Sequence, residues 1–360
     1  MTGRTVRLGL LGAADIAVRR ILPTVSRAPG ITLTAVASRD PERARTLAAA
    51  YGADALPDYR AVLADPRVDA VYVPVPAALH ADWVRAALEA GKHVLAEKPL
   101  TTDPRTTAEL VALAEKSGLV LRENYLFVHH PQHRAVLDLI ARGAVGEVRA
   151  VSAAFTIPPR PPADIRYRAD LGGGALLDVG VYPLRAAQLL LGPALRVAGA
   201  VLRTDPARGV DVGGAAMLCR DADGAIAHLT FGMEHRYTSR YEVLGSTGRL
   251  LLDHAFTPPP DHRPVLLLEG PDGVRRHELE PYDQCLGGVE AFARAVGAGE
   301  ATGDTTGDPT GRTGGGTTGG TTDDPTGDEA GTSGAISTRQ AELTADIQRQ
   351  AQYAVGGDAR

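Results

Sequence analysis

Short apolar runs alternate with helical patterns through the first 125 residues, and this alternation limits the possible folds more than any other feature. Four runs of strand length are almost continuously apolar: Val6–Leu11, Ile31–Ala37, Asp69–Val75 and His93–Ala96. Strands of this kind are buried on both faces, which is typical of a parallel sheet covered by helices. Because crossovers between parallel strands are right-handed, residues 1–125 are predicted to form a doubly wound Rossmann domain.

The chain after residue 125 follows a different pattern. A helix over Pro131–Arg142, a strand over Glu147–Phe155 and a helix over Val181–Leu191 precede strand-like runs between 195 and 279. Asp-Gly turn signals separate several of these runs, so they predict a large, mostly antiparallel open sheet. The fold class is therefore α/β: a Rossmann domain, then an α+β domain over 126–300.

A low-complexity tract interrupts the chain near its C-terminal end. Gly and Thr dominate residues 301–334, with six acids against one arginine. This composition cannot bury enough apolar surface to fold, so it predicts a disordered insertion, with a metal-binding or partner-binding tail as the weaker alternative. The spacing of Ile336–Ala354 then predicts that residues 335–360 form a helix that returns to the body.

Charge and cysteine content exclude several classes of protein. The 38 basic and 43 acidic residues nearly balance, and no basic block resembles a surface for nucleic acid or membrane. Two cysteines without a C-x-x-C pair argue against a disulfide scaffold, and no metal site is expected. No signal-peptide pattern and no apolar run of about 20 residues is found, so the chain is expected to be cytoplasmic.

The turn after the first strand is a candidate site for a dinucleotide. Gly12, Ala13, Ala14, Asp15 and Ile16 stand where the dinucleotide fingerprint aims a tight turn and a helix N-terminus at a pyrophosphate. The middle glycine of that fingerprint is Ala14 here. An ordinary tight turn between a strand and a helix is therefore the alternative.

Ser38 and Arg39 end the second strand, at the position that separates NAD sites from NADP sites. An NAD site usually places an acid here for the ribose diol, whereas a hydroxyl and a guanidinium suit a 2′-phosphate. The sequence therefore favours NADP(H). A solvated turn arginine, or a ribose contact from Asp40, is the alternative.

Two motifs follow later strands, at the carboxyl edge of the sheet where ligands bind. Pro76 to His80 place a histidine at a helix start, where it either approaches the cofactor or packs in the interior. Glu97-Lys98-Pro99 holds a lysine on a stiff backbone, where its ammonium can bind a carbonyl oxygen and supply a proton as hydride arrives. Glu97 is expected to orient Lys98, although a Glu-Lys pair is more often a surface pair.

A glycine-rich segment precedes the helix at Val181. Gly172-Gly173-Gly174 allows the backbone to approach another group closely, such as a ligand. Asp178 and Tyr182 are four residues apart, so a helix that begins by Asp178 places both on one face. With Lys98 they would form a proton-handling trio, and a helix cap followed by a core tyrosine is the alternative.

Together these motifs resemble the glucose–fructose oxidoreductase / inositol dehydrogenase (GFO/IDH/MocA) family. The resemblance covers Val6 to Ala298 and rests on G-x-x-G-A-A-D-I-A, A-G-K-H-V-L-A-E-K-P-L and G-G-G-A-L-L-D-V-G-V-Y-P-L. Glu123-Asn124-Tyr125, the H-H-P-Q-H run at 129–133 and Ile165-Arg166-Tyr167 are most similar to the nucleotide-sugar 3-ketoreductases of deoxysugar biosynthesis.

The resemblance implies roles for individual residues. Lys98 would be the general acid/base, Tyr182 its partner near the ketone, and Asp178 a support for the substrate or the lysine. Arg166 would reach the cofactor near its nicotinamide end, and Ser38-Arg39 would hold the 2′-phosphate. Pro76, His80, Glu97 and Lys98 would lie along the cofactor. The domain over 126–300 would bind the substrate and mediate oligomerisation.

The implied function is NADPH-dependent reduction of the C3 keto group of a TDP-linked keto-deoxyhexose in antibiotic deoxysugar biosynthesis, with Lys98 as proton donor. A homo-oligomer, either a dimer or a tetramer, is expected through the open sheet. One alternative is an NADP-dependent dehydrogenase of a free sugar or cyclic diol. Another is a catalytically silent NADP-binding sensor, against which the presence of both Lys98 and Tyr182 argues.

Overall fold

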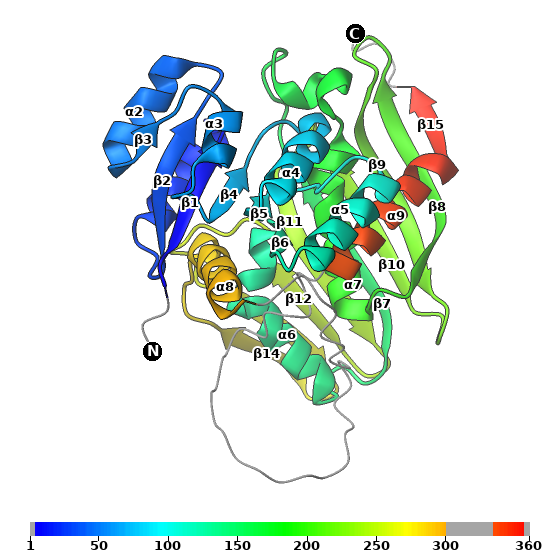
Figure 1. Cartoon of the computed structure of the whole chain (residues 1–360). Helices are drawn as coiled ribbons and strands as arrows, with labels where there is room; N and C mark the ends of the chain where they lie inside the picture. Colours follow the sequence, from blue (N-terminus) through cyan, green and yellow to red (C-terminus); the bar gives the residue numbers. More distant parts are fainter. Residues whose placement is uncertain (1–3, 300–333, 356–360) are drawn as a thin grey trace.

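Two β-sheets organise the structure, a computed structural model that describes residues 4–299 and 334–355. Figure 1 shows the smaller sheet with its helices at the N-terminal end of the chain and the larger sheet beside it. The predicted insertion at 301–334 lies outside the described residues, except for Gly334, so its predicted disorder stays a prediction.

The smaller sheet, sheet A, has six strands that are all parallel. In spatial order they are β3 (Asp54–Ala55), β2 (Ile31–Ala37), β1 (Val6–Leu11), β4 (Ala70–Val73), β5 (His93–Ala96) and β6 (Leu121–Glu123). The order reverses direction between β1 and β4, and the crevice beyond this switch point is where open α/β sheets bind ligands. The predicted Rossmann domain is confirmed.

Helices cover both faces of sheet A. One layer contains α3 (Tyr59–Ala64), α4 (His80–Glu89) and α5 (Pro104–Lys116), and the other contains α1 (Leu22–Val25), α2 (Pro41–Tyr51) and α8 (Gln284–Ala298). Asp40 and Asp103 cap α2 and α5, and in both helices proline takes a first-turn position. The sequence assigns α8 to the second domain, but Val289 and Phe292 pack into the core of sheet A.

The larger sheet, sheet B, has nine strands and is mostly antiparallel, as predicted. Only the pairs β7–β10 and β8–β15 are parallel among its described pairings. In spatial order the strands are β14 (Gly273–Glu278), β13 (Val265–Gly270), β12 (Arg249–Asp253), β11 (Thr238–Gly245), β7 (Val148–Thr156), β10 (Ile226–Gly232), β9 (Val210–Arg220), β8 (Leu195–Asp205) and β15 (Ala351–Val355).

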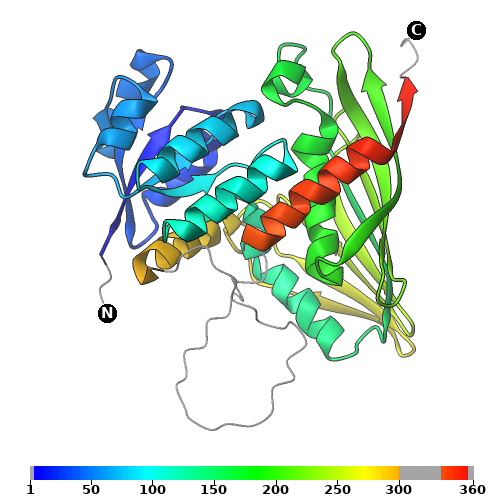
Figure 2. The same ribbon diagram turned by 45° about the vertical axis from the view of Figure 1, so that its right-hand side comes forward.

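The described helices that pack against sheet B lie on one face of it. These are α6 (Pro131–Ala141), α7 (Val181–Leu191) and α9 (Gly334–Gln350), and Figure 2 shows them on the same side of the sheet. Alternate residues of the strands point into this layer and form one apolar core with α7 and α9.

The helix predicted over Ile336–Ala354 does return to the body, but it ends earlier than its apolar spacing indicated. It ends at Gln350, and residues 351–355 form β15 parallel to β8. The free edge of β8 offers backbone hydrogen bonds at this point, and such pairing overrides the weak preference of the local sequence for helix.

Candidate active site

Lys98 lies at the carboxyl edge of sheet A, two residues after β5 ends. Its ammonium donates to the Asp178 main-chain oxygen at 2.8 Å and to Oδ1 of the same residue at 2.9 Å. Nζ also lies 5.4 Å from the centre of the Tyr182 ring. The structure therefore brings together the lysine, carboxylate and phenol that the sequence singles out.

The local fold explains why the Asp178 main-chain oxygen is open to Lys98. Residues Leu176–Gly180 form a π-helical turn before α7, and the Leu176 carbonyl accepts from the Val181 N–H five residues later. The residue five positions after Asp178 is Pro183, which has no N–H to offer the Asp178 carbonyl. The Lys98 ammonium donates to this carbonyl.

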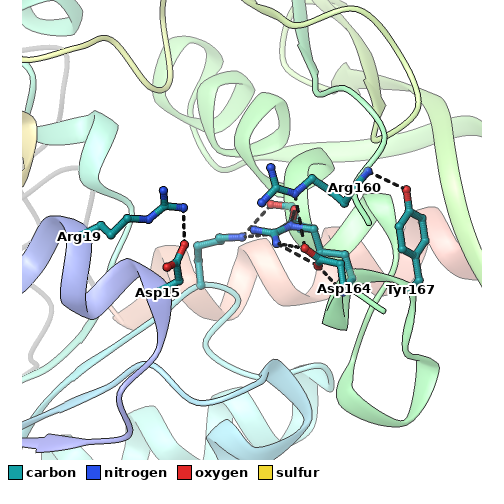
Figure 3. A network of polar contacts seen from close by, with 8 residues as sticks. Asp15, Arg19, Arg160, Asp164 and Tyr167 are labelled. Carbon is teal, nitrogen blue, oxygen red and sulfur yellow. Dashed lines mark hydrogen bonds and ion pairs between the residues drawn. The ribbon is translucent and has the colours of Figure 1, made fainter. Parts of the chain in front are cut away.

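Arg166 holds the other oxygen of Asp178. Its Nε donates to Asp178 Oδ2 at 2.5 Å, and its Nη1 donates to Asp164 Oδ1 at 3.1 Å. Figure 3 shows Asp164 and Arg160 in this network, and it also labels Asp15 and Arg19, which pair with each other on the helix that follows β1. Arg166 was expected to reach the cofactor, and two carboxylates hold its guanidinium, which no sequence pattern indicated.

Charges fix the protonation states in this cluster. Burial opposes ionisation of Asp178, but Lys98 and Arg166 outweigh it and lower the pKa of the carboxyl to about 2. Burial also opposes the charge of Lys98, yet the Asp178 carboxylate raises the pKa of the ammonium above its ordinary value. Burial raises the pKa of Tyr182 to about 12, although Lys98 acts in the opposite direction. At neutral pH the site therefore holds an ammonium, a carboxylate and a phenol.

Two donors in this cluster are left for a ligand. The Lys98 ammonium has three N–H groups and donates two of them to Asp178, so one N–H group is left unused. The Tyr182 hydroxyl makes no hydrogen bond to any residue in 4–299 or 334–355. An oxygen such as that of a ketone can therefore accept from Lys98 and Tyr182 together.

Glu97 does not orient Lys98, contrary to expectation. Its carboxylate accepts from the Tyr72 hydroxyl at 2.7 Å and from the Asn124 side-chain amide at 2.6 Å. Its charge helps to raise the pKa of the Lys98 ammonium, but less than that of Asp178 does. Asp178 has the role that was expected of Glu97, because the chain folds back from 80 residues away.

The Gly12 turn has the geometry that a close approach requires. Gly12 has φ +109°, and its N–H donates to the Ala37 main-chain oxygen at 2.8 Å. A Cβ on Gly12 would lie 3.1 Å from the Tyr59 hydroxyl, so both the positive φ and the tight contact disfavour a larger residue. The helix that begins at Asp15 directs its first N–H groups from this turn, which suits a pyrophosphate.

Arg39 is the free cation beside this turn. Its side chain is exposed and makes no ion pair or hydrogen bond within the part of the chain that the structure describes. Asp40 instead accepts from the N–H groups of Glu42 and Arg43, as the cap of α2. Its carboxylate is committed to the helix, so the ribose contact left open for Asp40 is disfavoured, and an NADP 2′-phosphate fits Arg39.

His80 is an interior residue rather than a cofactor contact. It is 1% exposed, and its two ring nitrogens lie 2.7 Å from the main-chain oxygens of Pro99 and Val75. Burial lowers the pKa of the imidazole. The ring joins the loop after β4, which contains Pro76, to the segment after Lys98, and the packing alternative is the correct one.

The glycine turn at 172–174 approaches its own chain. A Cβ on Gly173 would lie 2.5 Å from the Arg166 main-chain oxygen, and one on Gly172 would lie 3.1 Å from Ala77 Cβ. Close packing against these two segments accounts for Gly172 and Gly173, and a Cβ on Gly174 would meet the Asp211 carboxylate. The ligand contact suggested for them is therefore not needed to explain the sequence.

Asp211 on β9 is a site residue that the sequence analysis missed. Its Oδ2 accepts from the Leu176 N–H at 2.7 Å, where the π-helical turn begins that carries Asp178. Burial raises the pKa of Asp211 to about 6, although the backbone N–H groups act against it. An acid inside a strand is unusual, and that was the available signal.

The raised pKa of Asp211 predicts how stability depends on pH. In the folded chain its pKa is about 6, against an ordinary 3.8, so ionising it destabilises the fold by on the order of 2–3 kcal/mol. This penalty develops as pH rises from about 4 to 6 and is constant above. The wild type pays this penalty and Asp211→Asn does not. The free energy of unfolding of Asp211→Asn, minus that of wild type, should therefore rise by about that amount between pH 4 and pH 8, measured by urea unfolding.

Asp223→Asn is the matched control for this measurement. Arg220 lowers the pKa of Asp223 to about 2. The difference in unfolding free energy between Asp223→Asn and wild type should therefore stay nearly constant between pH 4 and pH 8. A flat difference for Asp211→Asn as well would show that the Asp211 carboxyl is not perturbed.

Within 4–299 and 334–355, no group of His, Cys, Asp and Glu side chains is placed to bind a metal ion. In the same ranges, every helix is too short or too polar to span a bilayer.

Both parts of the chain are similar to known oxidoreductases. Residues 6–125 match the family described as "Oxidoreductase family, NAD-binding Rossmann fold", and residues 133–251 match the GFO/IDH/MocA C-terminal domain. A dTDP-3,4-didehydro-2,6-dideoxy-alpha-D-glucose 3-reductase of Streptomyces violaceoruber is 58% identical over 82% of this chain and 86% of its own length. A protein of the same name from Actinomadura kijaniata is 52% identical over 82% of this chain and 89% of its own length.

A solved structure agrees with these sequence matches. KijD10, a 3-ketoreductase from Actinomadura kijaniata in complex with NADP and TDP-benzene, superposes with a TM-score of 0.88 at 45% identity, covering 98% of this chain and 100% of that one. KijD10 has also been solved with one tyrosine changed to phenylalanine and with one lysine changed to alanine. This chain therefore belongs to the GFO/IDH/MocA family of oxidoreductases.

Proposed function

We propose that this protein is an NADPH-dependent 3-ketoreductase that reduces the C3 carbonyl of a TDP-linked keto-deoxyhexose in deoxysugar biosynthesis. The observation that carries the proposal is the partly buried Lys98 ammonium at the carboxyl edge of sheet A. Asp178 holds it beside a Tyr182 hydroxyl that makes no hydrogen bond within the described residues. Relatives named dTDP-keto-deoxyglucose 3-reductases, at 58% and 52% identity, support the substrate class.

The residues of this chain act on the proton side of the reaction. NADPH, bound over the Gly12 turn with its 2′-phosphate at Ser38 and Arg39, supplies the hydride that goes to C3. Lys98 Nζ donates its proton to the oxygen that becomes the hydroxyl, and it regains a proton from solvent after release. The Tyr182 hydroxyl donates a second hydrogen bond to the same oxygen, which stabilises the developing negative charge.

Asp178 and Arg166 position the donor. Asp178 holds the ammonium in one place and keeps its pKa high, so the amine is protonated throughout the neutral range. Arg166 compensates the second oxygen of Asp178, so the carboxylate does not take up the proton itself. This arrangement presents the ammonium, rather than a neutral amine, to the ketone.

The function is tested by offering both classes of substrate. NADPH oxidation should be rapid with the 3-keto form of a TDP-2,6-dideoxyhexose, and NADP reduction with D-xylose or a cyclic diol should be at least 100-fold slower by kcat/KM, since a difference of that size is a few kcal/mol of transition-state binding. The opposite ranking would make the protein a free-sugar or diol dehydrogenase. NADP binding without turnover of any of these substrates would favour the sensor alternative.

We also propose that the outer face of sheet B joins two copies of this chain. Figure 2 shows this face without a described helix on it, and Val201, Met217 and Leu244 expose 45%, 44% and 36% of their surface there. Met217→Lys should therefore reduce the mass measured by light scattering to that of a monomer. Ala49→Lys, on the exposed side of α2, is the control, and an unchanged mass in Met217→Lys would exclude this face.

The cytoplasmic location stays a prediction, since nothing in the described residues tests it.

A further inference from the structure

Behind the candidate site lies an ion pair that the proposed chemistry does not use. Arg185 Nη2 donates to Glu123 Oε2 at 2.8 Å, and the two side chains are only 2% and 3% exposed. Arg185 is on α7 and Glu123 is the last residue of β6, so the pair joins the helix layer of sheet B to sheet A.

Each partner is attached to one of the segments that carry the proposed proton donors. The second oxygen of Glu123, Oε1, accepts from the Leu100 N–H at 2.8 Å, two residues after Lys98. Arg185 follows Tyr182 by three residues on α7, so the two lie one helical turn apart on neighbouring positions. A continuous chain of contacts thus runs from Lys98 through Leu100, Glu123 and Arg185 to Tyr182.

Tyr125 closes this chain of contacts a second time. The Arg185 guanidinium lies 4.4 Å from the centre of the Tyr125 ring, and that ring meets the Tyr182 ring edge-on with centroids 5.8 Å apart. Gln340 on α9 holds Tyr125 in place. Its side-chain amide donates to the Tyr125 hydroxyl at 3.3 Å and to the Val181 main-chain oxygen at 2.8 Å. Figure 2 shows α9 lying beside α5 on this side of the molecule.

Stability alone is a weak reason to bury these two charges. Removing both charges from water costs more than most such pairs regain, and apolar replacements of similar size are often as stable. The pair is also incompletely satisfied, because the Nε and Nη1 atoms of Arg185 are buried without a hydrogen-bond partner among the described residues. The pair instead holds two segments in a fixed relative position, because the planar guanidinium and the carboxylate join segments that belong to different sheets.

We propose that Glu123 and Arg185 are positioning residues that set the distance between the Lys98 ammonium and the Tyr182 hydroxyl. The proposal rests on the proposed reductase function for its kinetic consequences. A ketone oxygen must accept from both donors at once, so a small shift of either segment would reduce the rate of the chemical step more than the binding of substrate.

The test removes both charges together. In the double variant Glu123→Gln with Arg185→Met, the Gln oxygen still accepts from the Leu100 N–H, and no unpaired charge is left in the interior. We expect its thermal midpoint to stay within a few degrees of wild type and NADPH binding to change by less than about 2-fold. We expect kcat for the keto sugar to fall at least 10-fold, with KM changed by less than about 3-fold. Arg203→Met with Glu234→Gln removes a pair at 2.9 Å outside the candidate site, and it should leave kcat unchanged.

A second measurement does not depend on turnover. The chain has three lysines, Lys92, Lys98 and Lys116, so the Lys98 signal can be assigned by nuclear magnetic resonance of ¹³C-lysine protein, using Lys98→Arg as reference. If the pair sets the spacing, the pKa of Lys98 should change in the double variant, although the total charge near it does not. The control pair should leave this pKa as in wild type.

The outcomes separate the two proposals. Wild-type kcat and an unchanged Lys98 pKa in the folded double variant would overturn the positioning role. A large loss of thermal stability would also overturn it, because the pair would then support the fold rather than the spacing. A wild-type protein that does not turn over the keto sugar would contradict the reductase function, and the lysine titration would still decide whether the pair sets the spacing.

Discussion

Changing Lys98 to alanine should lower kcat for the keto sugar by about 10³-fold, because general acid catalysis contributes about 10²–10⁴-fold to such steps. The reason is specific to this site: no other ammonium makes a contact with Asp178 in the described part of the chain, and Arg166 keeps its proton. NADPH affinity should change little, as measured by quenching of protein fluorescence, because Lys98 faces Asp178 and Tyr182 rather than the Gly12 turn.

Tyr182→Phe is the matched variant for this experiment. It removes one hydrogen bond to the ketone oxygen and leaves the ammonium, so the expected loss is about 10-fold. Since the pKa of Lys98 is raised, the wild-type kcat should show no loss of the proton donor between pH 7 and the ordinary lysine pKa of 10.5. Wild-type turnover in Lys98→Ala would remove Lys98 from the mechanism, and a larger loss in Tyr182→Phe than in Lys98→Ala would assign the proton to the tyrosine.

Changing Arg39 to alanine should raise the KM for NADPH by about 10–100-fold and leave that for NADH within about 2-fold. A guanidinium paired with a phosphate contributes about 1.5–3 kcal/mol, and NADH has no 2′-phosphate to lose it. The guanidinium needs no rearrangement to bind, because it is exposed and unpaired within the described chain. Initial rates with each cofactor, at saturating keto sugar, measure the effect.

Arg43→Ala is the control for this prediction. Arg43 is also exposed, but it lies in α2 beyond the Asp40 cap rather than at the end of β2. Its removal should affect neither cofactor. Equal losses of NADPH and NADH in Arg39→Ala would contradict the 2′-phosphate contact and would indicate a contact to the part that both cofactors share.

The sequence located the donors of the candidate site but not their partners. Lys98 was identified from its place after an apolar strand, and Asp178 and Tyr182 from their spacing before a helix. Glu97, the obvious neighbour, was the wrong partner for Lys98, and Asp178 was the right one. Adjacent residues at the end of a strand point in opposite directions, so the neighbour in sequence faced Tyr72 and Asn124 instead.

Interior polar residues show the same limit. Asp211 was not predicted, and the role of His80 was left open between a cofactor contact and interior packing. Both side chains hydrogen-bond to backbone atoms of segments that the sequence does not place beside them. The predicted helix ran to Ala354, but residues 351–355 form a strand because they pair with the free edge of β8.

Local pattern was sufficient for the elements of the chain. The apolar runs, the helical spacings and the Asp-Gly turn signals predicted the Rossmann class, the antiparallel sheet and several helices, because these features depend on burial and backbone geometry within a few residues. Only the tertiary structure decided which charges meet. Ion pairs such as Lys98 with Asp178 and Glu123 with Arg185 join residues 80 and 62 positions apart, and electrostatic energy depends on distance in space, which periodicity along the chain does not encode.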